Sequence, residues 1–585
     1  MVLEKMIIDL NKKGAVSSSF LARLKRKAAK KSRRQFVTNS QLIKAYHNLV
    51  KNKTIGRSVK IENLLRRRQV RTLSGVAIIT VLTRPYPCPG QCLFCPKEPG
   101  MPKSYLKNEP AAHRAFLTKF DPYAQVNVRL KALADNGHPI DKIELIVLGG
   151  TWSAYPENYQ YWFIKECFRA ANSYPSTSPA IAGSAQGILP EQTTKGSASK
   201  AKLYKGLKFE QHKNETTKHR IIGITLETRP DYINLDEIKR MRDLGCTRVE
   251  LGAQTVYDDV LKKNQRGHTV AQTIAATRLL KNAGFKINYH MMLNLPGSSI
   301  LRDKQMFVEL FSNSPASTRG IHRREAGDFQ PDLLKIYPCA VLRTAELYKL
   351  WLAKKYRPYT ERQLVALLLA IKKNIPPYVR IQRIIRDIPA GDIVAGSKTS
   401  NLRQLINNLG TRQCQCIRCR EIREQYSTKD KIKLFRHDYP ASGGQEIFLS
   451  FASPDQKKLY ALLRLRIPYQ DYNAPRPAAA GLPPLNLRGG EGELLPVLQN
   501  AALIRELHTY GQLISIKTKN QKLKANPAAQ HVGLGKRLMG EAEKIVKNET
   551  ACKKIAVISG VGVREYYKKL GYRLKDEYMV KDLKF

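Results

Sequence analysis

The apolar positions between residues 75 and 338 fall into short runs separated by amphipathic stretches. Six apolar runs, rich in β-branched residues, predict buried strands at 75–82, 144–150, 221–227, 248–254, 287–297 and 332–338. Between them, stretches such as 234–245 and 269–284 repeat their apolar positions at the spacing of a helix. Strands and helices in this alternation indicate a parallel sheet, and so an α/β fold with a partial or full barrel.

The pattern breaks in two places and changes after residue 440. Residues 172–214 are rich in Ser, Pro, Ala and Gly and then in Lys, which predicts a disordered insertion. A second irregular insertion occupies 312–327. We therefore expect a basic N-terminal segment at 1–74, a barrel at 75–400, a cysteine-rich linker at 401–440 and a smaller α/β domain at 441–585.

The charge of the chain narrows the class of partner. Its 585 residues carry 101 Lys and Arg against 48 Asp and Glu, a net charge of +53, which favours a polyanion such as nucleic acid. Two basic runs, at 22–34 and 64–71, are interpreted as phosphate contacts. No secretory leader and no apolar run of membrane-spanning length is recognisable, so a cytoplasmic location without membrane contact is expected.

Six of the ten cysteines form two tight triplets, a pattern typical of metal or cluster ligands in a reducing compartment. In the first, CPGQCLFC, three residues separate Cys88 from Cys92 and two separate Cys92 from Cys95. Three thiolates can hold three irons of a 4Fe-4S cluster, which leaves the fourth iron open for the amino and carboxylate groups of S-adenosylmethionine. This is the signature of radical S-adenosylmethionine (radical SAM) enzymes; a zinc site or a group of buried cysteines is the competing interpretation.

Polar residues at the ends of the next predicted strands fit the same cofactor, because ligands of such barrels bind at the carboxyl ends of the strands. Glycines after the second strand let the backbone approach a ligand that donates through its amino group. A carboxylate suits ribose hydroxyls, and an arginine suits the methionine carboxylate. The predicted S-adenosylmethionine residues are Gly149, Gly150, Thr151, Glu227, Arg229 and Gln254.

The second triplet, Cys414, Cys416 and Cys419, offers three thiolates within six residues, suited to one tetrahedral metal ion. We predict zinc at the junction of the two large domains. The fourth ligand stays open, with His437 and His508 as candidates.

A glycine-rich turn, QHVGLG, opens an amphipathic helix in the last domain and predicts a pyrophosphate site at the helix amino end. The order of strand, turn, helix and strand around it resembles the acetyl-coenzyme A core of the GNAT acetyltransferases. The resemblance implies that the preceding strand lines the pantetheine arm and that Tyr566 or Tyr567 donates a proton to the leaving thiolate. The implied acetyl-coenzyme A residues are Glu506, Leu507, His508, Thr509, Gln530, Gly533, Leu534, Gly535 and Tyr566.

A radical SAM barrel, a cysteine-rich linker and a GNAT domain in one chain resemble the catalytic subunit family of Elongator, the tRNA carboxymethyluridine synthases. The similarity covers residue 64 to the end apart from the insertions, and includes long stretches such as RTLSGVAIITVLTRPYPCPGQC and KIAVISGVGVREYYKKLGYR. In this family a lysine before the second strand touches acetyl-coenzyme A from the barrel side, and it corresponds to Lys142.

The resemblance implies one reaction that uses both domains. A 5′-deoxyadenosyl radical takes hydrogen from the methyl of acetyl-coenzyme A, the carbon radical adds to C5 of the wobble uridine, and oxidation with thioester hydrolysis leaves a carboxymethyl group. The expected partners are the anticodon stem-loop of tRNA and an electron donor such as ferredoxin or flavodoxin. The short spacing of the cluster cysteines suggests a prokaryotic stand-alone enzyme without obligate protein subunits; its oligomeric state stays open, with a homodimer as one candidate.

Two other functions compete with this interpretation. A protein lysine N-acetyltransferase would use only the last domain and a structural cluster, but a structural cluster needs no open iron. A non-catalytic tRNA-binding protein would not need the intact cysteines or Gly533 and Gly535.

Overall fold

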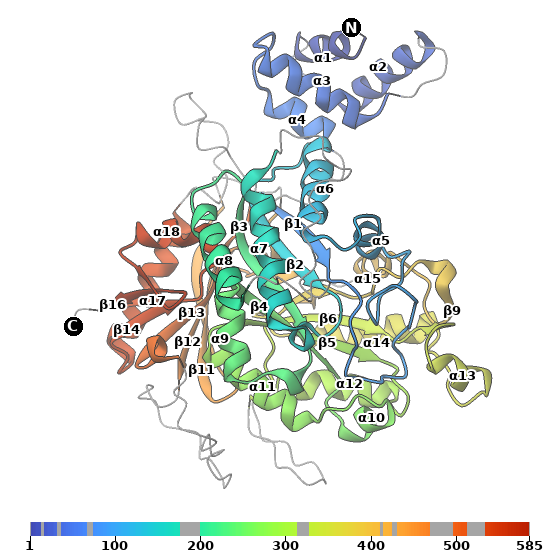
Figure 1. The fold of residues 1–585 in the computed structure, drawn as a ribbon, viewed down its shortest axis with the longest axis vertical. Helices are drawn as coiled ribbons and strands as arrows, with labels where there is room; N and C mark the ends of the chain where they lie inside the picture. The colour runs from blue at the N-terminus through green and yellow to red at the C-terminus, as the bar shows by residue number, and fades with distance from the viewer. Residues whose placement is uncertain are drawn as a thin grey trace.

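A seven-stranded parallel sheet, curled into a partial barrel, forms the centre of the computed structural model (Figure 1). The structure describes residues 2–12, 17–31, 37–66, 74–175, 199–312, 327–409, 413–423, 430–468, 495–511 and 533–583. The strands of the first sheet, in spatial order, are β1 (Val76–Leu82), β2 (Lys142–Leu148), β3 (Arg220–Thr228), β4 (Cys246–Gln254), β5 (Lys286–Leu293), β6 (Leu333–Pro338) and β8 (Arg380–Arg383). The six predicted strands are confirmed, and β8 is an addition.

Helices follow the strands and cover the outer face of the sheet (Figure 1). Sequence signals fix where they begin: Thr269 and Gln272 form a capping box at the start of α11, and Asp121 caps α6, which has Pro122 at its first position. The helices are α5 (Pro110–Leu117), α6 (Pro122–Asp135), α7 (Glu157–Ser173), α8 (Lys200–Asn214), α9 (Leu235–Asp243), α10 (Asp258–Lys263), α11 (Val270–Asn282), α12 (Ile300–Glu309), α13 (Leu347–Leu352), α14 (Glu361–Lys373), α15 (Leu402–Asn408) and α16 (Ile417–Arg420). Two short strands, β7 (Val341–Leu342) and β9 (Ile393–Ala395), pair beside the barrel.

Part of the predicted disordered insertion is a helix, which corrects the expectation for residues 172–214. Helix α8 begins at a Ser199 cap and packs on α7, because Leu203 and Leu207 form a buried apolar stripe. Although the sequence of α8 is rich in lysine, this apolar stripe is enough to hold the helix against α7. Residues 176–198 of that insertion and 313–326 of the second lie outside the described residues.

The second large unit is a mixed sheet with the strands β10 (Lys433–Pro440), β11 (Gly444–Ala452), β12 (Leu459–Pro468), β13 (Ala501–Thr509), β14 (Lys554–Val557), β16 (Tyr578–Asp582) and β15 (Arg573–Lys575), in that spatial order. Only β13 and β14 pair in parallel. Helices α17 (Leu534–Glu549) and α18 (Arg564–Lys568) pack beside them. Since β10 is part of this sheet, the domain begins at Lys433 and not at residue 441.

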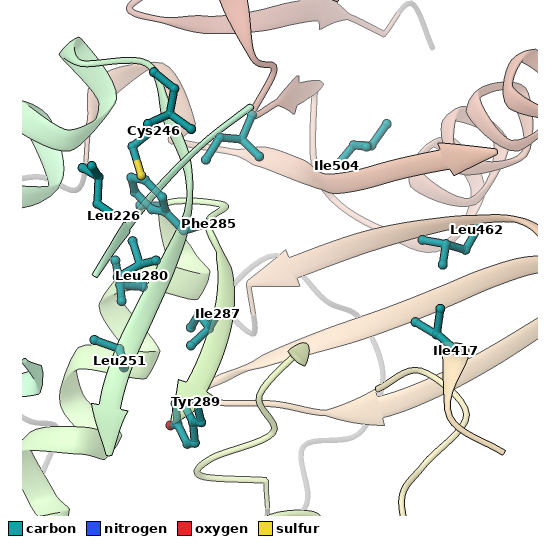
Figure 2. Close-up of a cluster of buried hydrophobic side chains, with 14 of the residues drawn as sticks. Leu226, Cys246, Leu251, Leu280, Phe285, Ile287, Tyr289, Ile417, Leu462 and Ile504 are labelled. Carbon is teal, nitrogen blue, oxygen red and sulfur yellow. The ribbon is translucent and has the colours of Figure 1, made fainter. Parts of the chain in front are cut away.

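One continuous apolar core joins the two sheets. Figure 2 shows side chains of this core from both units, among them Leu226, Cys246 and Phe285 from the first and Leu462 and Ile504 from the second. The two sheets therefore share one hydrophobic core and are not independent domains joined only by a linker.

The N-terminal segment is a small helical unit with its own apolar core (Figure 1). It comprises α1 (Val2–Lys12), α2 (Ser18–Lys31), α3 (Asn39–Lys51) and α4 (Val59–Leu65). It joins the barrel near the end of α6, where Arg66 Nε donates to the Gly137 carbonyl at 2.9 Å. Among all the helices described, none combines the length and apolar character that crossing a membrane would require.

Candidate active site

A single cavity of about 2330 Å³ connects the carboxyl ends of the barrel strands with the face of the second sheet. All three cysteines of the first triplet line one end of it, and Leu507 and Tyr566 line the other. The cavity therefore brings together the two groups of site residues that lie more than 400 positions apart in the sequence.

The cluster loop follows β1 and is held in place by its own backbone and by Arg266. The Cys95 amide donates to the Cys92 carbonyl at 3.2 Å, and Arg266 Nη1 donates to the Cys92 sulfur at 3.3 Å. A hydrogen bond from the Cys95 thiol, with the positive charge of Arg266, lowers the pKa of Cys92 below its usual range. Positive charge around a thiolate is what a cluster ligand requires.

Arg229 reaches the same loop from the end of β3. It makes two hydrogen bonds with the Asp231 carboxylate, at 2.9 and 2.8 Å, and is 4% exposed. Its remaining nitrogen, Nη1, is buried without a hydrogen-bond partner in the described part of the chain. A Cβ at Gly90 would lie 2.3 Å from this nitrogen, so the loop needs glycine there. The free nitrogen fits a carboxylate ligand bound at the cluster.

The other predicted S-adenosylmethionine residues divide into two groups. Gly150, Thr151, Glu227 and Gln254 line the cavity at the cluster end, with Tyr105 donating to Glu227 at 2.5 Å. Gly149 does not line it; its backbone, with φ 140°, packs so closely on Thr83 that a Cβ would lie 1.7 Å from the hydroxyl oxygen. Gly149 is needed for the turn, because no other residue fits there.

Our sequence interpretation missed a charged network in the barrel interior, of which His290 and Lys335 line the cavity while Glu250 lies behind them. Glu250, fully buried on β4, accepts hydrogen bonds from His290 at 2.8 Å and from Lys335. Burial opposes ionisation of Glu250, but Lys335 and His290 outweigh it and hold the pKa of this carboxyl well below its usual range. The signal was present in the sequence, because charged residues at alternate positions of apolar strands indicate a polar barrel interior.

At the far end, strand β13 separates from its neighbour. It pairs with β14 from Ala501 to Ile504 only, so the residues that follow have a free edge on that side. Glu506, Leu507, His508 and Thr509 on this stretch all line the cavity. Burial lowers the pKa of His508 to about 4, so its imidazole is neutral at physiological pH.

The glycine-rich turn leads into α17 beside this edge. Gly533 has φ 77° at the start of the helix, and Gly535 is so close to Tyr566 that a Cβ would lie 3.3 Å from the phenol oxygen. Gly533 and Gly535 line the cavity, whereas Leu534 is buried in the core. Gln530 lies outside the described residues.

The two candidate tyrosines differ in their surroundings. Both line the cavity, but Tyr566 is 39% exposed, whereas Tyr567 is 7% exposed and packs edge-on against Tyr572. On the barrel side Lys142 also lines the cavity, and burial, reinforced by Arg220, lowers the pKa of its ammonium group.

The second cysteine triplet is a compact cluster in the linker. The sulfur atoms of Cys414, Cys416 and Cys419 lie within 4.8 Å of one another. Three thiolates on a tetrahedral zinc ion, with bonds of about 2.3 Å, would be about 3.8 Å apart, so the set fits. Neither His437 nor His508 belongs to the cluster; they pack against Tyr378 and Tyr510.

The linker itself joins the two units as expected. The Ile417 amide donates to the Val379 carbonyl at 2.9 Å, just before β8. The Ile422 amide donates to the Leu459 carbonyl at 2.9 Å, in β12 of the second sheet. The triplet therefore lies where the barrel meets the second domain.

Comparison with known proteins agrees with this architecture. The sequence matches the Radical SAM superfamily over residues 86–300 and the Radical_SAM C-terminal domain over 331–409. It is 41% identical, over 89% of this chain and 88% of the relative, to the tRNA uridine(34) acetyltransferase of Methanocaldococcus infernus. It is 36% identical to human Elongator complex protein 3, over 89% and 86% of the two chains.

A solved structure supports the same relationship. The archaeal Methanocaldococcus infernus Elp3 with an N-terminal deletion (1–46) superposes with a TM-score of 0.65 and 39% identity, covering 87% of this chain and 99% of that one. The chain therefore belongs to the radical SAM family of the tRNA uridine(34) acetyltransferases and Elongator complex protein 3.

Proposed function

We propose that this protein modifies the wobble uridine of tRNA, transferring a carboxymethyl group derived from acetyl-coenzyme A to C5 of uridine 34. The observation that carries the proposal is the single cavity lined both by the cluster cysteines and by the β13 edge with Tyr566. The names of the relatives, tRNA uridine(34) acetyltransferase, support the same substrate. A reaction that needs a radical and an acyl donor in one place explains why the two folds share a cavity.

At the cluster end, Cys88, Cys92 and Cys95 would hold a 4Fe-4S cluster, and S-adenosylmethionine would bind its open iron. Bound there, these groups supply a 5′-deoxyadenosyl radical. The free Nη1 of Arg229 would take the methionine carboxylate. Gly150, Thr151, Glu227 and Gln254 would enclose the rest of the molecule and keep water from it.

At the other end, the second domain would bind acetyl-coenzyme A as a GNAT domain does. The free edge of β13 at Glu506–Thr509 suits the amides of the pantetheine arm, and the turn at Gly533 and Gly535 suits the pyrophosphate. Lys142 would close the site from the barrel side. Tyr566 faces the cavity beside Gly535, so we assign the proton donor for the thiolate to Tyr566, with Tyr567 supporting it from the core.

The remaining partners follow from charge and cysteine chemistry. The basic N-terminal unit and the +53 net charge favour tRNA phosphates, with the anticodon nucleotides unstacked into the cavity. An electron donor such as ferredoxin or flavodoxin would reduce the cluster. Zinc in the linker cysteines would hold the two domains together. We propose a cytoplasmic location, because six of the ten cysteines fall in two metal-binding triplets, a pattern that suits a reducing compartment.

The experiment that tests the proposal is nucleoside mass spectrometry. tRNA is incubated with anaerobically reconstituted protein, S-adenosylmethionine, dithionite and acetyl-coenzyme A, with each component omitted in turn. We expect carboxymethyluridine only in the complete mixture. Release of deoxyadenosine without the modified nucleoside would keep the radical enzyme and reject the substrate.

The matched variant is Cys92→Ala, which removes one cluster ligand from a loop whose backbone is held independently. We expect it to lose the modified nucleoside and deoxyadenosine release completely while its tRNA affinity stays within about twofold, because phosphate contacts are made elsewhere. Filter binding to tRNA checks the second point. A parallel loss of tRNA binding would contradict this separation of tasks.

A further inference from the structure

Arg248 lines the cavity near the amino end of β4, beside Lys286, which reaches Glu506 of the second sheet. Strand β4 points alternate residues into the barrel, and Arg248 lines the cavity together with Gly252 and Gln254 on the same face. It is 5% exposed. Its Nη1 forms an ion pair of 2.5 Å with Glu144 of β2.

The other edge of this guanidinium is free. Nε and Nη2 of Arg248 are buried and have no hydrogen-bond partner within the described residues. Leaving a buried N–H of a charged group unpaired is unfavourable, so such groups usually have a hydrogen-bond partner, here a ligand. Nε–H and Nη2–H are parallel and lie on one edge of the plane, an arrangement that grips two lone pairs of a carbonyl or carboxylate.

Neighbouring cations in the same part of the cavity are already engaged. Lys286, the register partner of Arg248 on β5, lies 3.4 Å from Glu506, and Arg380 on β8 lies 2.6 Å from Glu421. Glu250, two residues along β4, is bonded to Lys335 and His290. Among the described residues, no carboxylate is hydrogen-bonded to the free edge of Arg248.

We propose that this edge of Arg248 binds the acyl oxygen of the two-carbon unit, first as the thioester carbonyl and, after hydrolysis, as the carboxylate. The inference rests on the proposed function, because it assumes that acetyl-coenzyme A enters the cavity from the β13 edge. The acyl oxygen is the only strongly polar atom on the acetyl group. In the proposed reaction the acetyl group extends from the β13 edge of the cavity towards the cluster cysteines, so it passes Arg248. The pyrophosphate is placed instead at Gly533, outside the barrel interior.

Calorimetric titration of the full chain with acetyl-coenzyme A and with free coenzyme A tests this, because the two ligands differ only in the acyl group. The wild type is expected to prefer acetyl-coenzyme A. Arg248→Gln is expected to weaken acetyl-coenzyme A binding about tenfold and to leave coenzyme A within about twofold. Arg248→Lys keeps the charge but lacks the two-pronged edge, so it is expected to lose the same preference.

Arg380→Gln is the matched control, since it removes one positive charge from the same region but from a guanidinium already bound to Glu421. It is expected to change both affinities by the same factor. An Arg248→Gln protein that keeps the full preference, or that loses both ligands equally, would overturn the subsite.

The titration, together with the nucleoside mass spectrometry described above, separates this inference from the proposed function. Formation of carboxymethyluridine by the wild type together with an unchanged preference in both Arg248 variants would refute the subsite alone. A wild type that binds neither ligand would refute the acetyl-coenzyme A part of the proposed function and the subsite with it.

Discussion

At the scale of single residues, the geometry of the cavity around the cluster cysteines depends on close packing at Gly90, where a side chain does not fit. Gly90 lies under Arg229, whose guanidinium is held on its other side by both oxygens of Asp231. The arginine therefore cannot retreat without giving up two charged hydrogen bonds, each worth about 1.5–3 kcal/mol. The position of Arg229, for which we propose a role in binding S-adenosylmethionine, is thus set by Gly90 and Asp231.

Gly90→Ala is expected to displace Arg229 and weaken S-adenosylmethionine binding tenfold or more, about 1.4 kcal/mol. The measurement is equilibrium binding of S-adenosylmethionine to reconstituted protein, with iron content and deoxyadenosine release recorded alongside. Gly391→Ala is the control, because a Cβ there meets nothing within 4 Å and is expected to change none of these quantities. Wild-type affinity in Gly90→Ala would show that Arg229 is not constrained as described.

At the scale of elements, the turn between β14 and α18 is pressed against β3 of the barrel. A Cβ at Gly560 would lie 2.0 Å from the Ile222 carbonyl oxygen, and one at Gly562 would lie 2.6 Å from the Arg220 Cβ. Backbone atoms of two domains meet here directly, so neither partner can yield as a flexible side chain would. This contact also fixes Arg220 and β3, which line the cavity between the two domains.

Gly560→Ala is expected to lower the free energy of unfolding by about 1–3 kcal/mol, the usual cost of overpacking a rigid contact. Urea denaturation measures it, and an affinity for acetyl-coenzyme A lowered in parallel would show that the cavity widens. Gly540→Ala, in α17 with nothing within 4 Å of the added Cβ, is expected to be neutral or to stabilise by up to about 1 kcal/mol. Equal stability of the two variants would mean that the interface adapts.

At the scale of the whole molecule, a buried ionic network locks the second sheet onto the barrel. Arg505 of β13 donates to both oxygens of Asp332, at 2.8 and 2.6 Å, and Asp332 also accepts from the Ile287 amide at 2.9 Å. Lys281 and Arg464 lie 3.5 and 3.6 Å from the same carboxylate. One aspartate of the barrel therefore balances cations from both domains.

Asp332 also makes the interface sensitive to acid. Burial opposes its ionisation, but Arg505, Lys281 and Arg464 outweigh burial and hold the pKa of Asp332 below its usual range. The carboxylate therefore contributes stability that is complete above about pH 4, the ordinary pKa of an unfolded aspartate, and is lost as the pH falls towards the folded pKa. The contribution changes by at most about 1.4 kcal/mol per pH unit.

Asp332→Asn is expected to cost about 3–5 kcal/mol at neutral pH, because buried cations lose their counter-charge. It is also expected to flatten the fall in unfolding free energy between about pH 5 and 3. Urea denaturation over a pH series tests both points, with the mostly exposed Asp387→Asn as control. Parallel pH curves for wild type and Asp332→Asn would contradict the assignment.

Local patterns in the sequence determined much of this protein. Apolar runs and helical spacing predict the six barrel strands, and the two cysteine triplets and the turn at Gly533 are visible as short motifs, because each depends on residues that are neighbours in the chain. The prediction of disorder was wrong for α8. Its local pattern is weak, but packing stabilises the helix because its apolar stripe is buried on α7. The sequence pattern also placed the start of the second domain too late, since β10 is identified only by its pairing with β11.

Only the tertiary structure decided which side chains of the barrel and of the second sheet come together. The joint cavity depends on side chains from strands that are far apart in the chain, and so do the Glu250 network and the free edge of Arg248. The same holds for the different exposure of Tyr566 and Tyr567, on which our proposal for the proton donor rests. The physical reason is that burial and pairing of a charge are properties of its surroundings, and those surroundings form only when the two sheets pack.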